Sequence, residues 1–410
     1  MKNKARTLGS KPRFTGKKLV KLNPEASHTS ISSKARTASL RLAGISDFGN
    51  KIENFRSAFE EADGIIFEEF GVAVVNEESN RKVSMLTSAT ATRNTFLYSE
   101  PERYVYAISP AKKSAVKNKT YKDDKKAMWG VHATGIFDSK FTGRNIRLAI
   151  LDTGFYLKHA DFKGRNIKSK SFINGEAVND GNGHGSHCTG VSCGNINKKT
   201  KTRYGTALAA EIYIGKVLSN EGSGTDAGIL AGMEWAMQNK CRIISMSLGA
   251  EVRKGEKYSD IYEEIAKKLN KNGAIIIAAA GNESHRRSGK ISPVGHPANC
   301  PSIMAVAALD SSLKVADFSC GGINKNGGQV DIAAPGVDIY SSWVSPEKYN
   351  IISGTSMATP FTAGIAALYW EENPGATPSD IWMYLIQNAR RLDLRSSDVG
   401  AGLVQAPFKK

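Results

Sequence analysis

Residues 146–154 read IRLAILDTG, an apolar run of strand length that ends on an acid, Asp152, and a glycine. Three further apolar runs resemble it: 212–217, 243–247 and 274–278. Stretches with helical periodicity alternate with these runs: 228–239, 261–271 and 356–370. Short buried strands that alternate with helices are typical of a parallel sheet covered on both faces. The sequence therefore predicts an α/β fold with a doubly wound, mostly parallel sheet.

Three polar residues framed by small neighbours follow one another as acid, imidazole and hydroxyl. Asp152 ends the first strand, His184 lies in GHGSHCTG (183–190), and Ser356 lies in GTSMATP (354–360). A serine hydroxyl is a weak nucleophile until a base takes its proton, and that base needs an acid to hold its tautomer. The three residues therefore predict a nucleophilic triad.

Ser356 opens the apolar helix predicted over 356–370, and Pro360 falls in its first turn, where a missing N–H costs little. The amino end of a helix carries free amides and a positive dipole. Both stabilise an oxyanion that develops beside the serine. This segment therefore favours acyl transfer.

Two other interpretations of these motifs remain. Asp152-Thr153-Gly154 also marks aspartic proteases, which need a second copy of the motif or a homodimer, and the chain holds no second copy. His184, His187 and Cys188 have a spacing that could bind zinc, although the remaining ligands are not evident.

The three segments, together with AAAGNE (278–283), are similar almost letter for letter to motifs of the subtilisin-like serine proteases. The resemblance covers about residues 129–405 and keeps the family's order. It implies that Ser356 is the nucleophile, that His184 is the general base and then the acid, and that Asp152 orients the imidazole. It also implies that the Asn282 side-chain amide and the Ser356 backbone amide bind the oxyanion, and that catalysis needs no cofactor.

The resemblance further implies where an extended polypeptide substrate binds. Three short segments would flank the substrate and form the walls of its primary pocket: Ser247, Leu248 and Gly249; Ala279, Ala280 and Gly281; Gly222, Ser223 and Gly224. Binding of this kind adds the substrate as a strand, so main-chain hydrogen bonds provide affinity. Glu283 and His296 are expected near the pocket.

Composition divides the chain into a basic tail predicted to be disordered (1–45), a small α+β domain (46–110), a lysine-rich linker (111–126) and the catalytic domain (127–410). The small domain is expected to hold a helix and three strands: 52–62, 65–67, 72–75 and 104–108. By position it resembles the family's inhibitory propeptide. That implies a zymogen with an intramolecular inhibitor and self-processing between residues 111 and 128; a permanent accessory domain is the alternative.

The net charge of +17 could indicate a basic binding protein for nucleic acid or an anionic membrane. However, the tail carries +10 of it and the linker +5, and such runs are usually solvated. We therefore expect no specific nucleic-acid partner. No apolar run reaches the ~18 residues of a membrane span, so no transmembrane segment is expected.

Five cysteines, an odd number without a disulfide-framework spacing, favour free thiols in a reducing compartment. With no recognisable signal peptide, the prediction is a cytoplasmic protein, with non-classical export as the alternative. This setting is also compatible with a dedicated maturation protease for one precursor peptide. A free Cys188 near the site would make activity sensitive to thiol reagents.

Structural calcium is a further possibility that the resemblance raises. Asp161 lies where the family often supplies a calcium carboxylate, but the loop 195–203 carries four cations. Such a loop is a poor site for a hard dication.

Overall fold

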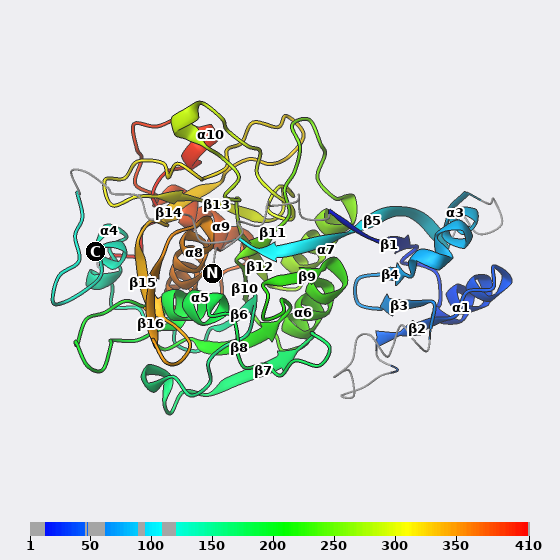
Figure 1. Cartoon of the computed structure of the whole chain (residues 1–410), viewed down its shortest axis with the longest axis horizontal. Coiled ribbons are helices and arrows are strands. Elements are labelled where there is room, and N and C mark those ends of the chain that lie inside the picture. Colours follow the sequence, from blue (N-terminus) through cyan, green and yellow to red (C-terminus); the bar gives the residue numbers. More distant parts are fainter. Residues whose placement is uncertain (1–12, 46, 48–61, 89–94, 109–119, 409–410) are drawn as a thin grey trace, which may run out of the picture.

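A computed structural model describes residues 13–45, 47, 62–88, 95–108 and 120–408. A small N-terminal unit lies beside a much larger one, and a single strand runs from the first into the second (Figure 1). No helix among the described residues is long and apolar enough to cross a membrane.

A seven-stranded parallel sheet forms the centre of the large unit. Its order is β14 (Ile332–Pro335), β13 (Met304–Leu309), β12 (Ile275–Ala279), β10 (Ile243–Met246), β6 (Arg147–Asp152), β8 (Glu211–Lys216) and β7 (Ile167–Ser171). All six pairings are parallel. The central strands are mostly apolar and buried because helices cover both of their faces. The predicted α/β fold is confirmed.

Four helices form the outer layers: α5 (His184–Cys193), α6 (Asp226–Gln238), α7 (Asp260–Lys271) and α8 (Thr355–Glu372). Figure 1 shows α5 and α8 on one side of the sheet and α6 and α7 on the other. The central helix α8 is buried from Thr355 to Trp370. Shorter helices and an outer helix complete the unit: α4 (Trp129–Ala133), α9 (Pro378–Gln387) and α10 (Ser396–Val399). A hairpin of β15 (Ile339–Ser342) and β16 (Tyr349–Ile352) packs beside α5.

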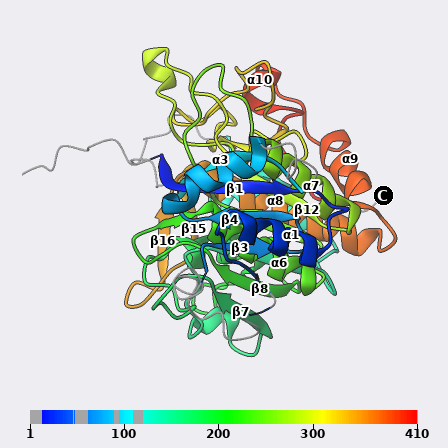
Figure 2. The same ribbon diagram turned by 90° about the vertical axis from the view of Figure 1, so that its right-hand side faces the viewer.

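The N-terminal unit has a mostly antiparallel sheet in the order β5 (Phe96–Ala107), β1 (Phe14–Leu22), β4 (Val72–Val75), β3 (Gly64–Phe67) and β2 (Leu42–Gly44). Helices α1 (His28–Thr37) and α3 (Asn80–Ser88) lie on the side away from the large unit (Figures 1 and 2). The strands predicted at 65–67, 72–75 and 104–108 correspond to β3, β4 and the end of β5. The helix predicted from Ile52 falls in residues 48–61, outside the described residues.

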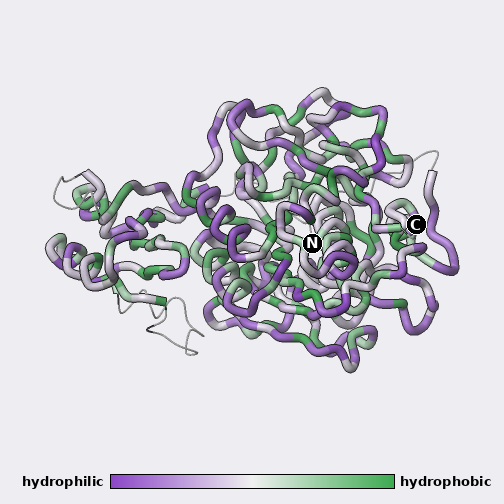
Figure 3. Tube along the Cα trace, turned by 180° about the vertical axis from the view of Figure 1, so that it is seen from behind, coloured by the Kyte–Doolittle hydropathy of each residue, from purple (hydrophilic) through white to green (hydrophobic). Residues whose placement is uncertain are grey.

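Both faces of this small sheet are buried. Residues that face α1 and α3 include Val20, Ala73 and Val75. Their neighbours along the strands, among them Leu19 and Val74, join the core of the large unit. Figure 3 shows the apolar segments gathered inside both units and the polar ones on the outer loops. Alternation along each strand therefore attaches the small unit to the large one.

The prediction of a disordered tail over residues 1–45 is wrong for the part that the structure describes. Residues 14–44 contain β1, α1 and β2. Two basic side chains in this stretch meet acids of the large unit: Arg13 Nη2 lies 2.7 Å from Glu256 Oε2, and Lys21 Nζ lies 2.8 Å from Glu264 Oε2. These two charges are thus part of an interface.

Candidate active site

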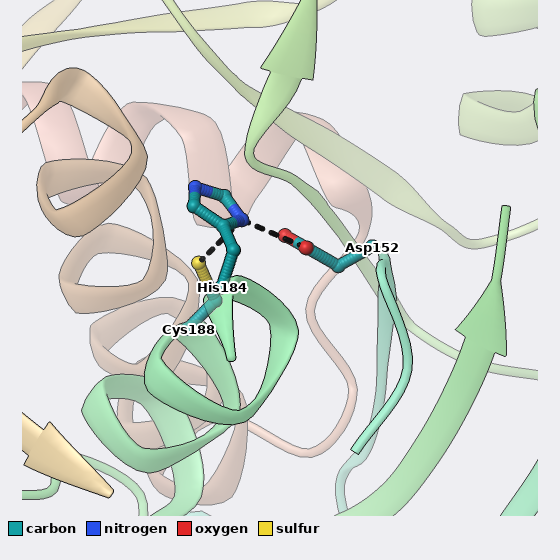
Figure 4. Close-up of side chains that lie close together, drawn as sticks. All are labelled: Asp152, His184 and Cys188. Atoms are coloured by element: carbon teal, nitrogen blue, oxygen red, sulfur yellow. Dashed lines mark hydrogen bonds and ion pairs between the residues drawn. The ribbon is translucent and has the colours of Figure 1, made fainter. Parts of the chain in front are cut away.

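Asp152 and His184 are brought together by the end of β6 and the start of α5. Their side chains are buried, and Asp152 Oδ1 lies 2.8 Å from His184 Nδ1 (Figure 4). Gly183 precedes the histidine with φ +103°, a conformation that favours glycine. Burial disfavours the imidazolium, but the Asp152 carboxylate outweighs it and raises the pKa of His184 well above 6.5.

Ser356 lies in the first turn of α8, and its hydroxyl is close to two carbonyl oxygens. Ser356 Oγ is 3.2 Å from Ser247 O and 3.2 Å from Ile108 O. No hydrogen bond joins Ser356 to His184 among the described residues, and His184 Nε2 has no partner within that part of the chain. The imidazole therefore has one nitrogen on the acid and the other free to take a proton.

Cys188 is buried one turn of α5 beyond His184 (Figure 4). Its Sγ lies 3.8 Å from His184 Nδ1 and 3.5 Å from Ser356 O. Burial raises the pKa of the Cys188 thiol, which therefore stays neutral and packs between the two elements.

Asn282 follows β12 and is fixed against the start of α8. Its Oδ1 accepts hydrogen bonds from Thr355 N and Thr355 Oγ1, both at 2.9 Å. Nδ2 then lies next to Gly354, where a Cβ would come within 2.9 Å of it. The amide is held with its donor side toward the backbone that precedes Ser356.

Two of the predicted substrate segments flank β5 of the chain's own N-terminal unit. On one side β9 (Ser223–Thr225) pairs antiparallel with β5, with Val105 opposite Gly224. On the other side β11 (Leu248–Gly249) pairs with it, with Ala107 opposite Leu248. Ala107 N donates to Gly222 O at 2.8 Å, and Ile108 N lies 3.5 Å from Ser247 O. The end of β5 is therefore bound as a strand that leads to Ser356.

The third predicted segment, Ala279 to Gly281, lies at the end of β12 and does not pair with β5. Gly281 has φ +114°, and a Cβ there would come within 2.5 Å of Glu283 Oε2. Cys320 Sγ donates to the same Glu283 oxygen at 3.2 Å, and burial raises the pKa of Glu283. Glu283 is thus a buried carboxyl that is hydrogen-bonded to Cys320, and it lies behind the expected pocket wall formed by Ala279, Ala280 and Gly281.

His296 borders β11 only through its backbone. Its carbonyl accepts from Ala250 N at 2.8 Å, whereas its side chain turns toward α6, where Nε2 lies 3.1 Å from Asp226 Oδ1. Asp226 Oδ2 in turn accepts from Arg103 N of β5 at 2.7 Å. This side chain therefore belongs to the contact between the two units.

The zinc interpretation does not fit the geometry. His187 Nε2 donates to the carbonyl oxygen of Ile339 at 2.9 Å, and within the described residues this ring is not grouped with His184 and Cys188 as near enough to share an ion. Within the described residues, the acid, imidazole and thiol groups near enough to share an ion are those of Asp152, His184 and Cys188. His184 Nδ1 is already hydrogen-bonded to Asp152.

The residues around Asp161 do not fit calcium either. Asp161 Oδ2 accepts hydrogen bonds from Tyr204 Oη at 2.9 Å and Tyr349 Oη at 3.0 Å. Lys198 donates its backbone N–H to Asp161 Oδ1 at 3.2 Å and its ammonium to Ala160 O at 2.7 Å. Tyrosine hydroxyls and a lysine thus occupy the oxygens that a cation would need.

The sequence of the large unit is similar to that of known proteins. The chain matches the model of the subtilase family over residues 143–402. The chain belongs to the subtilase family. This subtilase is 37% identical to subtilisin DY from Bacillus licheniformis over 265 residues, which are 64% of this chain and 90% of that protein. It is 36% identical to subtilisin E from Bacillus subtilis (strain 168) over 276 residues, or 67% and 68% of the two chains.

A solved structure agrees with these sequence matches. Sphericase superposes with a TM-score of 0.59 at 30% identity, covering 68% of this subtilase and 98% of that chain. The protein is therefore a serine endopeptidase of the subtilisin type, which acts on polypeptides and needs no cofactor for catalysis. The N-terminal unit lies outside the family match.

Sequence reasoning missed several residues of this subtilase's site. Ile108 was only the end of a predicted strand, and its alternating apolar pattern carries no information about a partner. Thr355, which fixes Asn282, lies inside the GTSMATP motif without a predicted role, and Asp180, which accepts from Gly183 N and Ser186 N on either side of His184, precedes the histidine motif.

Proposed function

We propose that this subtilase is a zymogen that cuts its own chain after Ile108. One observation carries the proposal: the carbonyl oxygen of Ile108 lies 3.2 Å from Ser356 Oγ at the end of a strand held between β9 and β11. This contact brings the peptide group of Ile108 next to the nucleophile, and such proximity is what attack on its carbonyl carbon requires. Processing within 111–128 is the expectation from the sequence. Residues 111–119 lie outside the described residues, and residues 120–128 are tied to the large unit, for example by Tyr121 N to Ser311 O at 2.9 Å.

In the proposed reaction, His184 Nε2 takes the proton of Ser356 as Oγ attacks the Ile108 carbonyl carbon. The oxyanion receives hydrogen bonds from the Asn282 amide and the Ser356 backbone N–H. Protonation of the Ser109 nitrogen by His184 breaks the Ile108–Ser109 bond and leaves an acyl-enzyme. Water, deprotonated by His184, then releases the Ile108 carboxylate and restores Ser356. Other extended polypeptides would bind as β5 does.

The contacts of β5 support an inhibitory role for the N-terminal unit. Glu100 Oε1 accepts from Asp260 N at 2.9 Å and from Ile261 N at 3.2 Å at the start of α7. Glu102 Oε1 accepts from Ala227 N at 3.1 Å at the start of α6. Carboxylates at helix amino termini are stabilising. The cut strand would therefore stay bound and block the site until the unit dissociates.

Self-processing is tested by following the intact mass of the purified full-length chain over hours. We expect a fragment of residues 1–108 and a product that begins at Ser109, because Ile108 is the residue whose carbonyl contacts Ser356. The Ser356→Ala variant, prepared in the same way, stays full length and controls for contaminating proteases. A first cut at another bond, or equal cutting of both proteins, would contradict the proposal.

The rate of self-processing should rise with pH. The base must be neutral, and Asp152 raises the pKa of His184 well above 6.5, so the protonated and inactive form persists to a higher pH than for an ordinary histidine. Below that pKa the rate falls about tenfold per pH unit. First-order rates of fragment release between pH 5 and pH 10 give the midpoint. A midpoint below 6.5 would count against this role of Asp152.

We expect thermal stability to be independent of calcium. Tyr204, Tyr349 and Lys198 already satisfy the Asp161 carboxylate, so a chelator should change Tm by less than about 2 °C. The Asp161→Ala variant should be destabilised by about 2 kcal/mol, because two tyrosine hydroxyls lose their acceptor. Scanning calorimetry with and without chelator measures both, and a clear rise of Tm with millimolar calcium would refute the expectation.

A further inference from the structure

Asp180 is a buried carboxylate that neither the triad nor the substrate segments use. It is 3% exposed and accepts hydrogen bonds from five donors. The distances are 3.0 Å from Thr153 Oγ1, 2.9 Å from Asn182 N, 2.9 Å from Gly183 N, 2.8 Å from Ser186 N and 2.7 Å from Ser186 Oγ. Such a fully satisfied buried acid fixes the groups around it.

Its donors come from the two segments that carry the acid and the base. Thr153 directly follows Asp152 at the end of β6. Gly183 precedes His184, and Ser186 follows it in the first turn of α5. One carboxylate thus holds both segments, with Oδ1 on Thr153 and Gly183 and Oδ2 on Ser186.

The two hydroxyls extend this connection. Thr153 Oγ1 donates to Asp180 and accepts from Gly185 N at 2.8 Å. Ser186 Oγ donates to Asp180 and accepts from Tyr156 N at 2.9 Å. Each hydroxyl therefore joins one segment to the other, and a charged acceptor at the centre strengthens both chains of hydrogen bonds.

An amide in place of Asp180 could not accept all five bonds. Its NH₂ group would face backbone N–H groups of Gly183 or Ser186, which cannot reverse their direction. At least one segment would move, and the Asp152–His184 hydrogen bond depends on both.

We propose that Asp180 is a positioning residue for catalysis, which sets the orientation of His184 relative to Asp152 and Ser356. This inference rests on the proposed roles of those three residues. A purely structural role is the competing explanation, because a carboxylate near the amino end of α5 also stabilises that helix. The two explanations differ in which measurement changes.

The test measures peptide hydrolysis by Asp180→Asn chains that immobilised unsubstituted enzyme has cut after Ile108, so that variants with an impaired triad are compared in the same processed form. A misplaced base lowers kcat by about 10–100-fold, while KM stays within about twofold, because substrate contacts are unaffected. In an Asp152→Asn background the same substitution should lower kcat by less than about threefold, because residues that act as one unit are not additive. Asp331→Asn is the control: Asp331 accepts from Ala305 N at 2.7 Å just before β14, a strand at one edge of the sheet, whereas Asp152 ends the interior strand β6.

Two results would overturn the inference. In one, Asp180→Asn lowers Tm but leaves kcat unchanged. In the other, Asp180→Asn lowers kcat by the same factor in the unsubstituted chain and in the Asp152→Asn chain. If Asp180→Asn does not fold, Thr153→Val carries the same test, since it removes only the hydroxyl between Gly185 and Asp180. Failure of the proposed function is distinguishable, because it shows as the absence of a cut after Ile108 in the unsubstituted chain, whereas failure of this inference leaves that cut in place.

Discussion

Asp152→Asn should lower kcat by about 10⁴-fold with little change in KM, a size known from other Ser-His-Asp triads. Asp152 Oδ1 accepts a hydrogen bond from His184 Nδ1 at 2.8 Å, which leaves Nε2 without a proton and able to act as the base. An asparagine NH₂ at that point would donate to Nδ1 and move the ring proton to Nε2. The imidazole could then no longer take the Ser356 proton.

Because the Asp152→Asn chain would not cut itself, the variants are first cut by immobilised unsubstituted enzyme, which is removed before steady-state hydrolysis of a chromogenic peptide is measured. Asp331→Asn is the matched acid-to-amide control. Circular dichroism and Tm establish that both variants are folded. A loss of less than about tenfold in kcat would mean that Asp152 does not hold the tautomer.

Gly185→Ala should lower kcat/KM by about 100-fold, because about 1 Å of misplacement costs that much. A Cβ on Gly185 would lie 2.2 Å from Gly154 O and 3.1 Å from Thr153 N, both backbone atoms of the segment that follows Asp152. The start of α5 must move away from the end of β6 to relieve this clash. His184 and Asp152 separate as a result.

Gly375→Ala is the matched control, since a Cβ there meets nothing within 4 Å. Both variants are compared with the unsubstituted chain in kcat/KM and in free energy of unfolding. The control should change neither, whereas Gly185→Ala should also lose about 1–3 kcal/mol of stability from overpacking. Full activity of Gly185→Ala would show that the two segments tolerate displacement.

The hydrophobic pattern predicted the central strands of the large sheet, but it predicted neither the edge strand β7 nor the strand β1 near the amino terminus. β6, β8, β10 and β12 are apolar runs because both faces are covered. The edge strand β7 reads IKSKS and lacks that signal. In β1, lysines surround Leu19, Val20 and Leu22, so the segment resembled a solvated tail. Lysine stems can cover apolar surface while the ammonium reaches an acid, as Lys21 does with Glu264.

Motifs identified the polar groups of the candidate site but not what contacts them. The acid, base and serine each lie at the end or start of an element, which the fold alone brings together. The pairing of β5 with β9 and β11 joins segments more than a hundred residues apart, and composition carries no trace of it. The zinc interpretation failed on position, since His187 faces the Ile339 carbonyl and is not grouped with His184 and Cys188. The cytoplasmic setting stays a prediction.

The strand β5 fixes the number of residues between the N-terminal sheet and Ser356. Its first half pairs with β1 in one sheet and its last residues pair with β9 and β11 beside the serine, within 12 continuous residues. Each residue spans about 3.3 Å along the strand. Deleting one residue between the part of β5 that pairs with β1 and the part that pairs with β9 and β11 would therefore place a different carbonyl beside Ser356. The side chains between the deletion and that carbonyl would then point to the opposite face of the strand. The proposed scissile bond is therefore set by the number of residues between the part of β5 that pairs with β1 and Ser356.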